Sequence, residues 1–294
     1  MPKFKILVAQ FPGGNSTHPD VADYVAGLMF QLRTHPDFGP GNVGAFKIAD
    51  TPITMGRNRV MKLAEDQGYD YVLMIDSDMS PDLPYPDSVP FFDAAWEFTK
   101  KHQGPCVVAA PYCGPPPGED VYVFHWHCSE SDSANPNFQI GNVNRYEAAG
   151  LRGIQRVAAL PTGLMLIPVE AVKRLAHPYF YYEWTDERQT HKLSTEDVTF
   201  ARDLDVVGVP QYCAWSSWAG HHKSKLVGRP ERIPGGSVPL FLRERAEELA
   251  RERLAGSVEV HEDKTGRTHE AKKLESRLKV PASLAEHKAV KHGH

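Results

Sequence analysis

This 294-residue sequence has few or none of several features that mark particular classes of protein. No apolar run approaches the roughly eighteen residues that a membrane-spanning helix needs, and the N-terminal segment leads into a predicted strand rather than resembling a signal peptide. The net charge is −4, so the overall electrostatics carries no nucleic-acid signature, although a local basic patch stays open. We therefore expect a soluble protein of the cytoplasm, or of the host cytoplasm if the protein is viral.

Cysteine is scarce as well. Cys106, Cys113, Cys128 and Cys213 show no C-x-x-C spacing, which argues against a zinc knuckle or a redox pair. Four scattered cysteines fit reduced thiols in a cytosol. Apolar residues, in contrast, make up 41% of the chain and aromatic residues 10%, which is ample for a packed core. The length allows one large domain or two small ones.

Predicted strands and helices alternate along most of the chain, which favours an α/β fold with a Rossmann-like, mostly parallel central sheet and flanking helices. Strands are expected near residues 4–10, 43–49, 71–75 and 105–110, two more within 154–167 and one near 206–212, and helices near 17–32, 55–67, 88–102 and 168–175. Residues 111–150 break this pattern and are expected to form a flap or insertion. Beyond residue 230 the sequence changes to a charged helix and a tail rich in Lys, Glu and His, so we predict a domain over 1–230 and a charged helical extension over 231–294.

An acidic pair follows the most apolar predicted strand. The run Tyr71–Ile75 is typical of a buried central strand, and it ends at Asp76-Ser77-Asp78. Alternation along an extended chain places Asp76 and Asp78 on the same side, where they repel each other unless a cation lies between them. Such hard oxygen ligands suit Mg²⁺ or Mn²⁺, which in turn bind a diphosphate. An ordinary turn explains the same three residues, and the short motif alone does not decide between the two interpretations.

Two residues in the first turn of the predicted helix 55–67 are also candidates. Arg57, next to Asn58, opposes the helix dipole, which favours anions at that end. A phosphate, a base edge or a carboxylate partner would explain the arginine, and so would a salt bridge to Glu65 or Asp66 on a nearby turn.

A second acidic pair, Glu196-Asp197, follows a good N-cap at Ser194 or Thr195. Negative charge in the first turn of a helix is stabilising, so a structural role explains both acids, and catalysis is the alternative. Gly163 lies between two predicted strands, where a glycine either lets the backbone approach a ligand or only relieves a bend.

Two groups of histidines have metal-binding potential. His221 and His222 follow a glycine and precede Lys223, so they could complete an oxygen-rich metal site while the lysine neutralises phosphate. An ordinary polar loop is the alternative. His125 and His127 share one face of a predicted strand, where a metal pair competes with the simpler interpretation of histidines on a wet face.

Taken together, these residues resemble the glycosyltransferases of the GT-A fold, in particular the family-2-like group, over about residues 4–225. The matching elements, in order, are a first strand and loop, Arg57-Asn58 on a helix, Tyr71 to Asp78, Pro161 to Ile167, Ser194 to Phe200, and Gly220-His221-His222. No single element is specific, but the shared order makes an accident improbable.

The resemblance implies a role for each candidate. Asp78 would bind the divalent metal, Mn²⁺ or Mg²⁺, on the diphosphate of a UDP- or GDP-sugar, and Asp76 would hold the ribose or a metal-bound water. The metal-binding histidine of the family would be His221 or His222, with His221 preferred because it directly follows the glycine. Asp197, rather than Glu196, would be the catalytic base. The residues expected to bind the sugar donor are Gln10, Arg57, Asn58, Asp76, Ser77, Asp78, Gly163 and Lys223.

The acceptor side matches nothing in the family. Trp126, Tyr182 and Trp184 are candidate stacking residues for an acceptor, which could be a hydroxymethylated DNA base, a protein or a glycan. A compact enzyme without a membrane helix suits a phage, viral or bacterial protein that modifies such acceptors. Two alternatives stay open. A sugar-phosphate nucleotidyltransferase would need a basic, glycine-rich loop that Gln10-Phe11-Pro12-Gly13-Gly14 does not provide, and a non-catalytic carbohydrate-binding protein would use the acids to hold a structural ion.

Overall fold

The computed structural model describes residues 3–12, 17–49, 52–114, 120–126, 140–222 and 226–227. These residues all belong to the first of two compact units, Met1–Arg232, and the second unit is Ile233–His294. The charged extension predicted over residues 231–294 therefore lies outside the described residues. In the described part of the chain, no helix combines the length and apolar character needed to cross a membrane.

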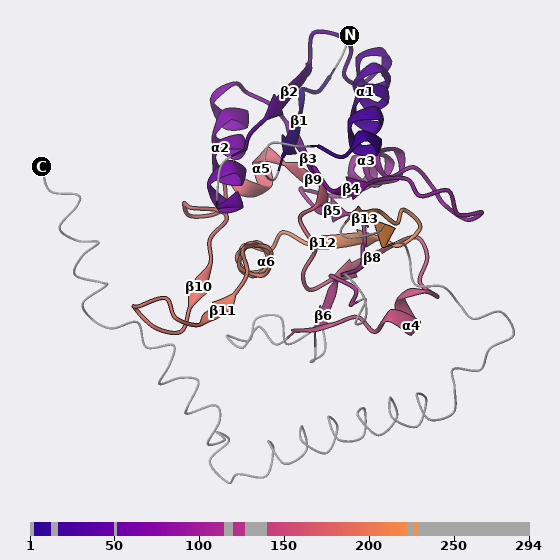
Figure 1. The fold of residues 1–294 in the computed structure, drawn as a ribbon. Coiled ribbons are helices and arrows are strands. Elements are labelled where there is room, and N and C mark those ends of the chain that lie inside the picture. Colours follow the sequence, from indigo (N-terminus) through magenta and orange to yellow (C-terminus); the bar gives the residue numbers. More distant parts are fainter. Residues whose placement is uncertain are drawn as a thin grey trace, which may run out of the picture. The chain divides into compact units, whose positions relative to one another are not determined.

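A seven-stranded sheet with the strand order β2-β1-β3-β9-β5-β12-β8 forms the centre of the fold (Figure 1). The strands are β1 (Ile6–Phe11), β2 (Val43–Lys47), β3 (Tyr71–Asp76), β5 (Val107–Ala109), β8 (Ile154–Val157), β9 (Leu164–Pro168) and β12 (Gln211–Ala214). The pairs β1–β2, β1–β3 and β5–β12 are parallel, whereas β9 is antiparallel to both of its neighbours and β8 is antiparallel to β12. The sheet is therefore mostly parallel in direction, with β9 and β8 reversed.

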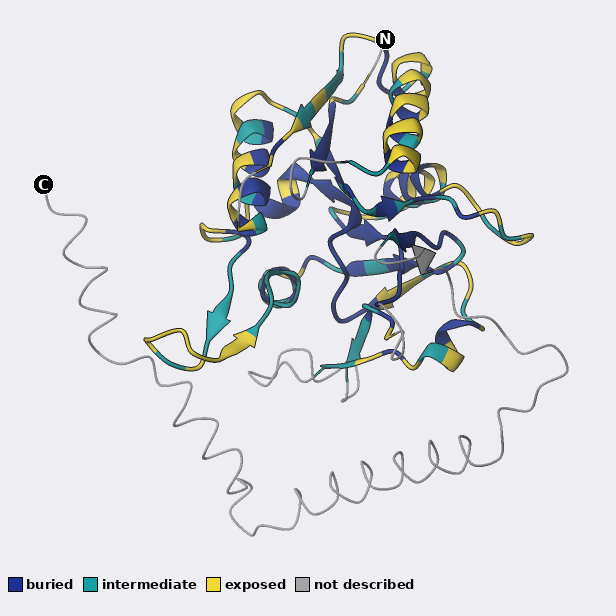
Figure 2. Ribbon diagram, in the orientation of Figure 1, coloured by how far each residue is buried: buried dark blue, intermediate teal, exposed yellow. Residues whose placement is uncertain are grey.

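Helices cover both faces of this sheet. They are α1 (Pro19–Thr34), α2 (Ile53–Asp66), α3 (Phe91–Lys101), α4 (Arg145–Ala148), α5 (Val169–Val172) and α6 (Glu196–Val206). Alternate residues of β1 and β3 enter two separate cores, because side chains of a strand point to opposite faces in turn. One core joins Leu7 and Met74 to α2, α5 and α6, and the other joins Val8 and Ile75 to α1 and α3. The predicted α/β class and the doubly covered central strand are confirmed, and Figure 2 shows the buried strands between helices exposed only on their outer sides.

Three smaller sheets extend from this framework: β14-β13-β4, β10-β11 and β6-β7. Their strands are β4 (Met79–Ser80), β6 (Phe124–Trp126), β7 (Ile140–Asn142), β10 (Glu183–Trp184), β11 (Lys192–Ser194), β13 (Gly220–His222) and β14 (Leu226–Val227). The sheet that contains β4 matters most for the site. β4 follows the acidic pair directly, and β13 pairs with it through Gly220↔Ser80 and His221↔Met79. This pairing brings the late histidines beside the early aspartates.

Candidate functional site

The candidate site lies at the carboxyl end of β3, where open α/β sheets bind ligands. Asp76 is the last residue of β3, and its backbone N–H donates to the carbonyl of Gly163 at 2.8 Å. The next N–H, of Ser77, donates to the carbonyl of Phe11 at 3.4 Å. The chain after β3 is thus held between the end of β1 and the start of β9. Asp76 and Asp78 therefore lie at the carboxyl end of β3.

Arg57 is the buried centre of an ionic network. Its side chain is only 2% exposed, and its guanidinium donates from Nη1 to Glu196 Oε1 at 2.7 Å. Nη2 donates to both oxygens of Asp76, at 3.0 and 3.2 Å. Burial opposes the charge of Arg57, but the two carboxylates outweigh it and raise the pKa of the guanidinium. Arg57 is therefore a permanent internal cation between two acids that are far apart in the sequence.

This network decides against one of the alternatives that the sequence left open. The sequence left open a salt bridge from Arg57 to Glu65 or Asp66. Glu65 instead accepts from the hydroxyl of Tyr179 at 2.5 Å, and Asp66 pairs with Lys62 at 2.9 Å on the exposed side of α2. The arginine faces inward, because position 57 lies on the face of α2 that packs against the sheet. The positive charge beside Asp76 is therefore supplied by Arg57.

Asn58 has a structural role in the fold. Its side-chain amide donates to the carbonyls of Thr54 and Phe180, at 2.8 and 2.7 Å. Its carbonyl oxygen accepts from the backbone N–H groups of Tyr179 and Phe180, at 2.9 and 3.0 Å. The four bonds use both amide hydrogens and both oxygen lone pairs. A contact with a sugar donor would have to break one of them, so the structure favours positioning of the 179–180 segment over ligand binding.

Asp197 differs from Glu196 in its partners. Glu196 is neutralised by Arg57, whereas the groups that donate to Asp197 are neutral: the hydroxyl of Thr195 and, at 2.9 Å, the N–H of Val198. Burial raises the pKa of the Asp197 carboxyl, the hydrogen bond from Thr195 opposes this, and the charge of Glu196 adds to it. A carboxylate with a raised pKa is suited to accept a proton.

Asp78 and His221 form a second feature of the site. His221 is 6% exposed, and its Nε2 lies 3.3 Å from Asp78 Oδ2. Its Nδ1 lies 3.0 Å from the carbonyl oxygen of Cys113. A carbonyl can only accept, so Nδ1 carries a proton, and a neutral ring then presents the lone pair of Nε2 to the carboxylate. That arrangement is repulsive unless Nε2 gains a proton or a cation is shared between the two groups.

A divalent ion fits this pair. Histidines that bind metals usually donate their other ring N–H to a carbonyl or carboxylate, as His221 does to Cys113. Two neighbouring ligands of an ion with bonds of about 2.1 Å are separated by roughly 3 Å, close to the 3.3 Å between His221 and Asp78. The described residues around Asp78 are therefore compatible with Mn²⁺ or Mg²⁺.

His222 points to the other side of β13, because neighbouring strand residues face opposite ways. Its backbone N–H donates to the carbonyl of Asp78 at 2.8 Å, but its ring stacks on His18, with the ring centroids 3.4 Å apart. Burial, followed by the nearby His18, lowers the pKa of His222. The structure thus places His221, and not His222, beside the Asp78 carboxylate.

Tyr112 is a site residue that sequence reasoning missed. It is 8% exposed, and its ring lies 5.1 Å from that of His221. Burial raises the pKa of the Tyr112 hydroxyl, as do the charges of Asp76 and Asp197. A Cβ at Gly163 would lie 2.9 Å from Tyr112 Cε1, so this ring is what requires a glycine there. The available signal was position: Tyr112 lies two residues after the end of the predicted strand 105–110.

The remaining predicted residues are spread over the fold. Gln10 and Ser77 are both buried, at 4% and 9% exposure, at the strand ends beside the acids. Burial, followed by the charge of Glu196, raises the pKa of the Tyr182 hydroxyl, and the ring of Trp184 lies 6.2 Å from that of Tyr182. Trp126 lies on the separate strand β6, under the guanidinium of Arg156 at 5.2 Å. Lys223 and His127 lie outside the described residues.

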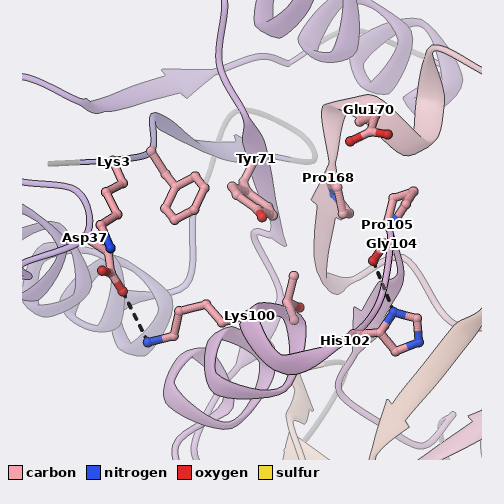
Figure 3. A pocket seen from close by; sticks show the side chains of 11 residues that line it. Lys3, Asp37, Tyr71, Lys100, His102, Gly104, Pro105, Pro168 and Glu170 are labelled. Atoms are coloured by element: carbon pink, nitrogen blue, oxygen red, sulfur yellow. Dashed lines mark hydrogen bonds and ion pairs between the residues drawn. The ribbon is translucent and has the colours of Figure 1, made fainter.

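A cavity of about 400 Å³ lies away from these acids (Figure 3). Tyr71, at the start of β3, and Pro105, just before β5, are part of its wall, together with Lys100 of α3. Asp76 is at the opposite end of β3. The cavity is therefore at the amino end of the parallel strands and does not belong to the candidate site.

Comparison with known proteins gives no family assignment. No protein-family model matches the chain, and no curated protein matches its sequence. Among solved structures, A197 from STIV matches with 15% identity and a TM-score of 0.47, over 78% of this chain and 96% of that one. GalNAc-T7, solved with UDP, GalNAc and Mn²⁺, has 11% identity and a TM-score of 0.38 over 74% of this chain, which spans 44% of that protein.

A third structure, of a glycosyltransferase involved in the glycosylation of the major capsid of PBCV-1, has 10% identity and a TM-score of 0.24, over 60% of this chain and 68% of that one. All three identities are low and the structural agreement is partial. The likeness is to the outline of the fold, and no activity follows from it for this chain.

Proposed function

We propose that this protein is a divalent-metal-dependent glycosyltransferase that moves a sugar from a UDP- or GDP-sugar to an acceptor hydroxyl. One observation carries the proposal: buried His221 has its Nε2 3.3 Å from the Asp78 carboxylate while its Nδ1 faces the carbonyl of Cys113. A divalent ion can be shared by this pair, which stands at the carboxyl end of the central strand, where a nucleotide diphosphate would bind.

A bound Mn²⁺ or Mg²⁺, held by Asp78 and His221, would neutralise the charge that develops on the leaving diphosphate. Arg57 holds Asp76 and Glu196 in fixed positions, since the three side chains are joined by short charged hydrogen bonds. In this proposal Asp76 orients the ribose of the sugar donor. Lys223, which follows the histidines in the sequence, is proposed to contact the diphosphate as well.

Asp197 is proposed as the base that removes the proton from the acceptor hydroxyl. Its raised pKa and its neutral partners suit it for accepting a proton, whereas the ion pair of Glu196 with Arg57 holds that acid in its charged, paired state. Glu196 then has a positioning role. The direction of proton transfer is from the acceptor oxygen to a carboxylate oxygen of Asp197 as the new glycosidic bond forms.

The acceptor is proposed to lie against Tyr182 and Trp184. Tyr182 lies near enough to Glu196 for that charge to raise the pKa of its hydroxyl, and the rings of Tyr182 and Trp184 are only half-buried, so they offer flat surfaces near the acids. A planar or sugar-like acceptor, such as a hydroxymethylated DNA base or a glycan, could stack there. Trp126 is not part of this proposal, because it lies on the small sheet β6-β7, where its ring packs under the guanidinium of Arg156 of β8.

A nucleotide-release assay tests the proposal. The full chain would be mixed with Mn²⁺ and a series of UDP- and GDP-sugars, with or without DNA that contains hydroxymethylcytosine, and free UDP or GDP would be measured. We expect metal-dependent release that is lost in Asp78→Asn and in Asp197→Asn but kept in Asp66→Asn, which removes an exposed acid on α2. Failure to bind any nucleotide sugar, with or without metal, would refute the proposed function.

A further inference from the structure

A second group of metal-ligating side chains lies on the other side of β13. His18 is the N-cap of α1, Asp20 lies in the first turn of the same helix, and His222 comes from β13. One ligand atom from each residue lies within 4.8 Å of the others. The group shares no side chain with the Asp78–His221 pair.

The ligand atoms of this group lie close together, with the rings of His18 and His222 stacked. The N–H of Asp20 points at His18 Nδ1 from 3.3 Å, so this nitrogen carries a lone pair, and it lies 3.7 Å from Asp20 Oδ2. His222 Nε2 lies 3.4 Å from the same oxygen. It is buried and has no hydrogen-bond partner, which is costly for a polar atom.

These separations suit a small tetrahedral ion. Zinc binds histidine nitrogen and carboxylate oxygen at about 2.0–2.2 Å, so its ligands are roughly 3.4 Å apart. The observed distances of 3.4 and 3.7 Å are close to that value. Two imidazoles and one carboxylate also favour zinc over magnesium or calcium, which prefer sets of oxygen ligands.

We propose that His18, Asp20 and His222 form a second metal site, specific for Zn²⁺ or a similar transition metal. The evidence for it does not depend on the proposed glycosyl transfer, since the two sites share no side chain. Zinc would bind His222 Nε2, which has no hydrogen-bond partner, and would take the place of the Asp20 N–H at His18 Nδ1. Because a metal lies in the plane of each imidazole that binds it, the stacked rings of His18 and His222 would turn apart to hold the ion. The fourth position would be open to water or to another ligand.

The site would also stabilise the turn that carries the acidic pair. The backbone N–H of His18 donates to the carbonyl of Ser77 at 3.0 Å, and that of His222 donates to the carbonyl of Asp78 at 2.8 Å. A metal that joins the two histidine side chains would therefore tie together the two segments that hold this turn. We infer a structural role for the ion, in which it keeps Asp78 in place.

Zinc titration by calorimetry tests this proposal. The full chain would be freed of metal with a chelator, in a background of Asp78→Asn and His221→Gln that removes the first candidate site. We expect one strong Zn²⁺ site per chain, and Co²⁺ in its place should give the intense visible absorption of a tetrahedral ion. His18→Gln, His222→Gln or Asp20→Asn should each weaken the Zn²⁺ affinity by roughly 100-fold or more. Mutation of a residue that only orients a metal ligand already lowers metal affinity by about 10- to 100-fold, and loss of the ligand itself should cost at least as much.

A matched control separates this site from incidental binding, since the chain has 14 histidines. His191 lies 3.7 Å from Asp186 and is exposed, but it belongs to no such group of three among the described residues. His191→Gln should leave the affinity unchanged. Equal isotherms for all variants, or an equal loss in His191→Gln, would overturn the proposal. Asp20→Asn guards against misfolding, because its side chain is 57% exposed, and each variant should keep the unfolding temperature of the background protein in chelator.

Discussion

Replacement of Arg57 with methionine should destabilise the protein strongly. The change leaves Asp76 and Glu196 in place, with side chains 16% and 14% exposed, but without the cation that accounts for three hydrogen bonds of 2.7 to 3.2 Å. Breaking a buried pair by removing one partner typically costs about 3–5 kcal/mol, because a charge stays buried without compensation. A typical domain has about 5–15 kcal/mol of stability in total, so the loss would be easy to measure.

The loss should also depend on pH. Burial already acts to raise the pKa of Asp76, and without Arg57 the opposing influence is gone. A carboxyl whose pKa is higher in the folded state than in the unfolded state contributes stability below the unfolded value and loses it as the pH rises through the folded value. The deficit of Arg57→Met relative to the natural protein should therefore be largest near neutral pH and should shrink in mild acid.

Denaturant unfolding at neutral and mildly acidic pH is the measurement. Lys62→Met is the control, since Lys62 lies on the same helix in an exposed pair with Asp66, and it should change stability little. Combining Arg57→Met with Asp76→Asn and Glu196→Gln should restore much of the lost stability by removing the unpaired charges. A loss of about 1 kcal/mol or less for Arg57→Met, the same at both pH values, would refute the reasoning.

Three further predictions concern the proposed site. Asp197→Asn should lower the rate of nucleotide-sugar turnover by about 100- to 10,000-fold with little change in sugar-donor binding. In the natural protein the rate should fall as the pH drops toward the raised pKa of the Asp197 carboxyl. An unchanged rate in Asp197→Asn would exclude Asp197 as the base. Asp78→Asn and His221→Gln should each weaken Mn²⁺ binding, measured by calorimetry, by at least about tenfold, and unaltered binding in both would contradict the proposed metal pair. Gly163→Ala should lower the free energy of unfolding by about 1–3 kcal/mol, because the added Cβ would lie 2.9 Å from Tyr112 Cε1. Gly27→Ala, with open space around it on α1, should be neutral or stabilising. Equal effects of the two changes would contradict the steric argument.

The fold was predictable because its signals are local. The apolar run Tyr71–Ile75 predicts a strand covered on both faces, and the structure has it as β3 with Val72–Ile75 wholly buried. The predicted helix 55–67 is α2, which begins at Ile53. The reversal of β9 was not predictable, since an apolar strand between two covering layers has the same sequence pattern whichever way it runs.

The sequence singled out several residues that the structure brings close together, but it was less informative about their pairings. Asp78 and His221 were expected to meet because of the resemblance, and the structure brings them together. Asn58, expected to bind the sugar donor, is fully used within the fold. Tyr112 was missed because a single aromatic residue after a strand has no distinctive pattern of its own, and its meaning depends on the ring of His221 and the backbone at Gly163.

The sequence by itself determined which residues form strands and helices, and that acids and histidines stand where strands end, because periodicity and chain direction are properties of neighbouring residues. Only the tertiary structure decided which charges meet. Arg57 pairs with Glu196 across 139 positions and not with Glu65 eight positions away. His221 faces Asp78, while the adjacent His222 faces His18 and Asp20. Charged groups combine by distance in space and by the cost of burial, and neither quantity exists until the sheet and its helices have packed.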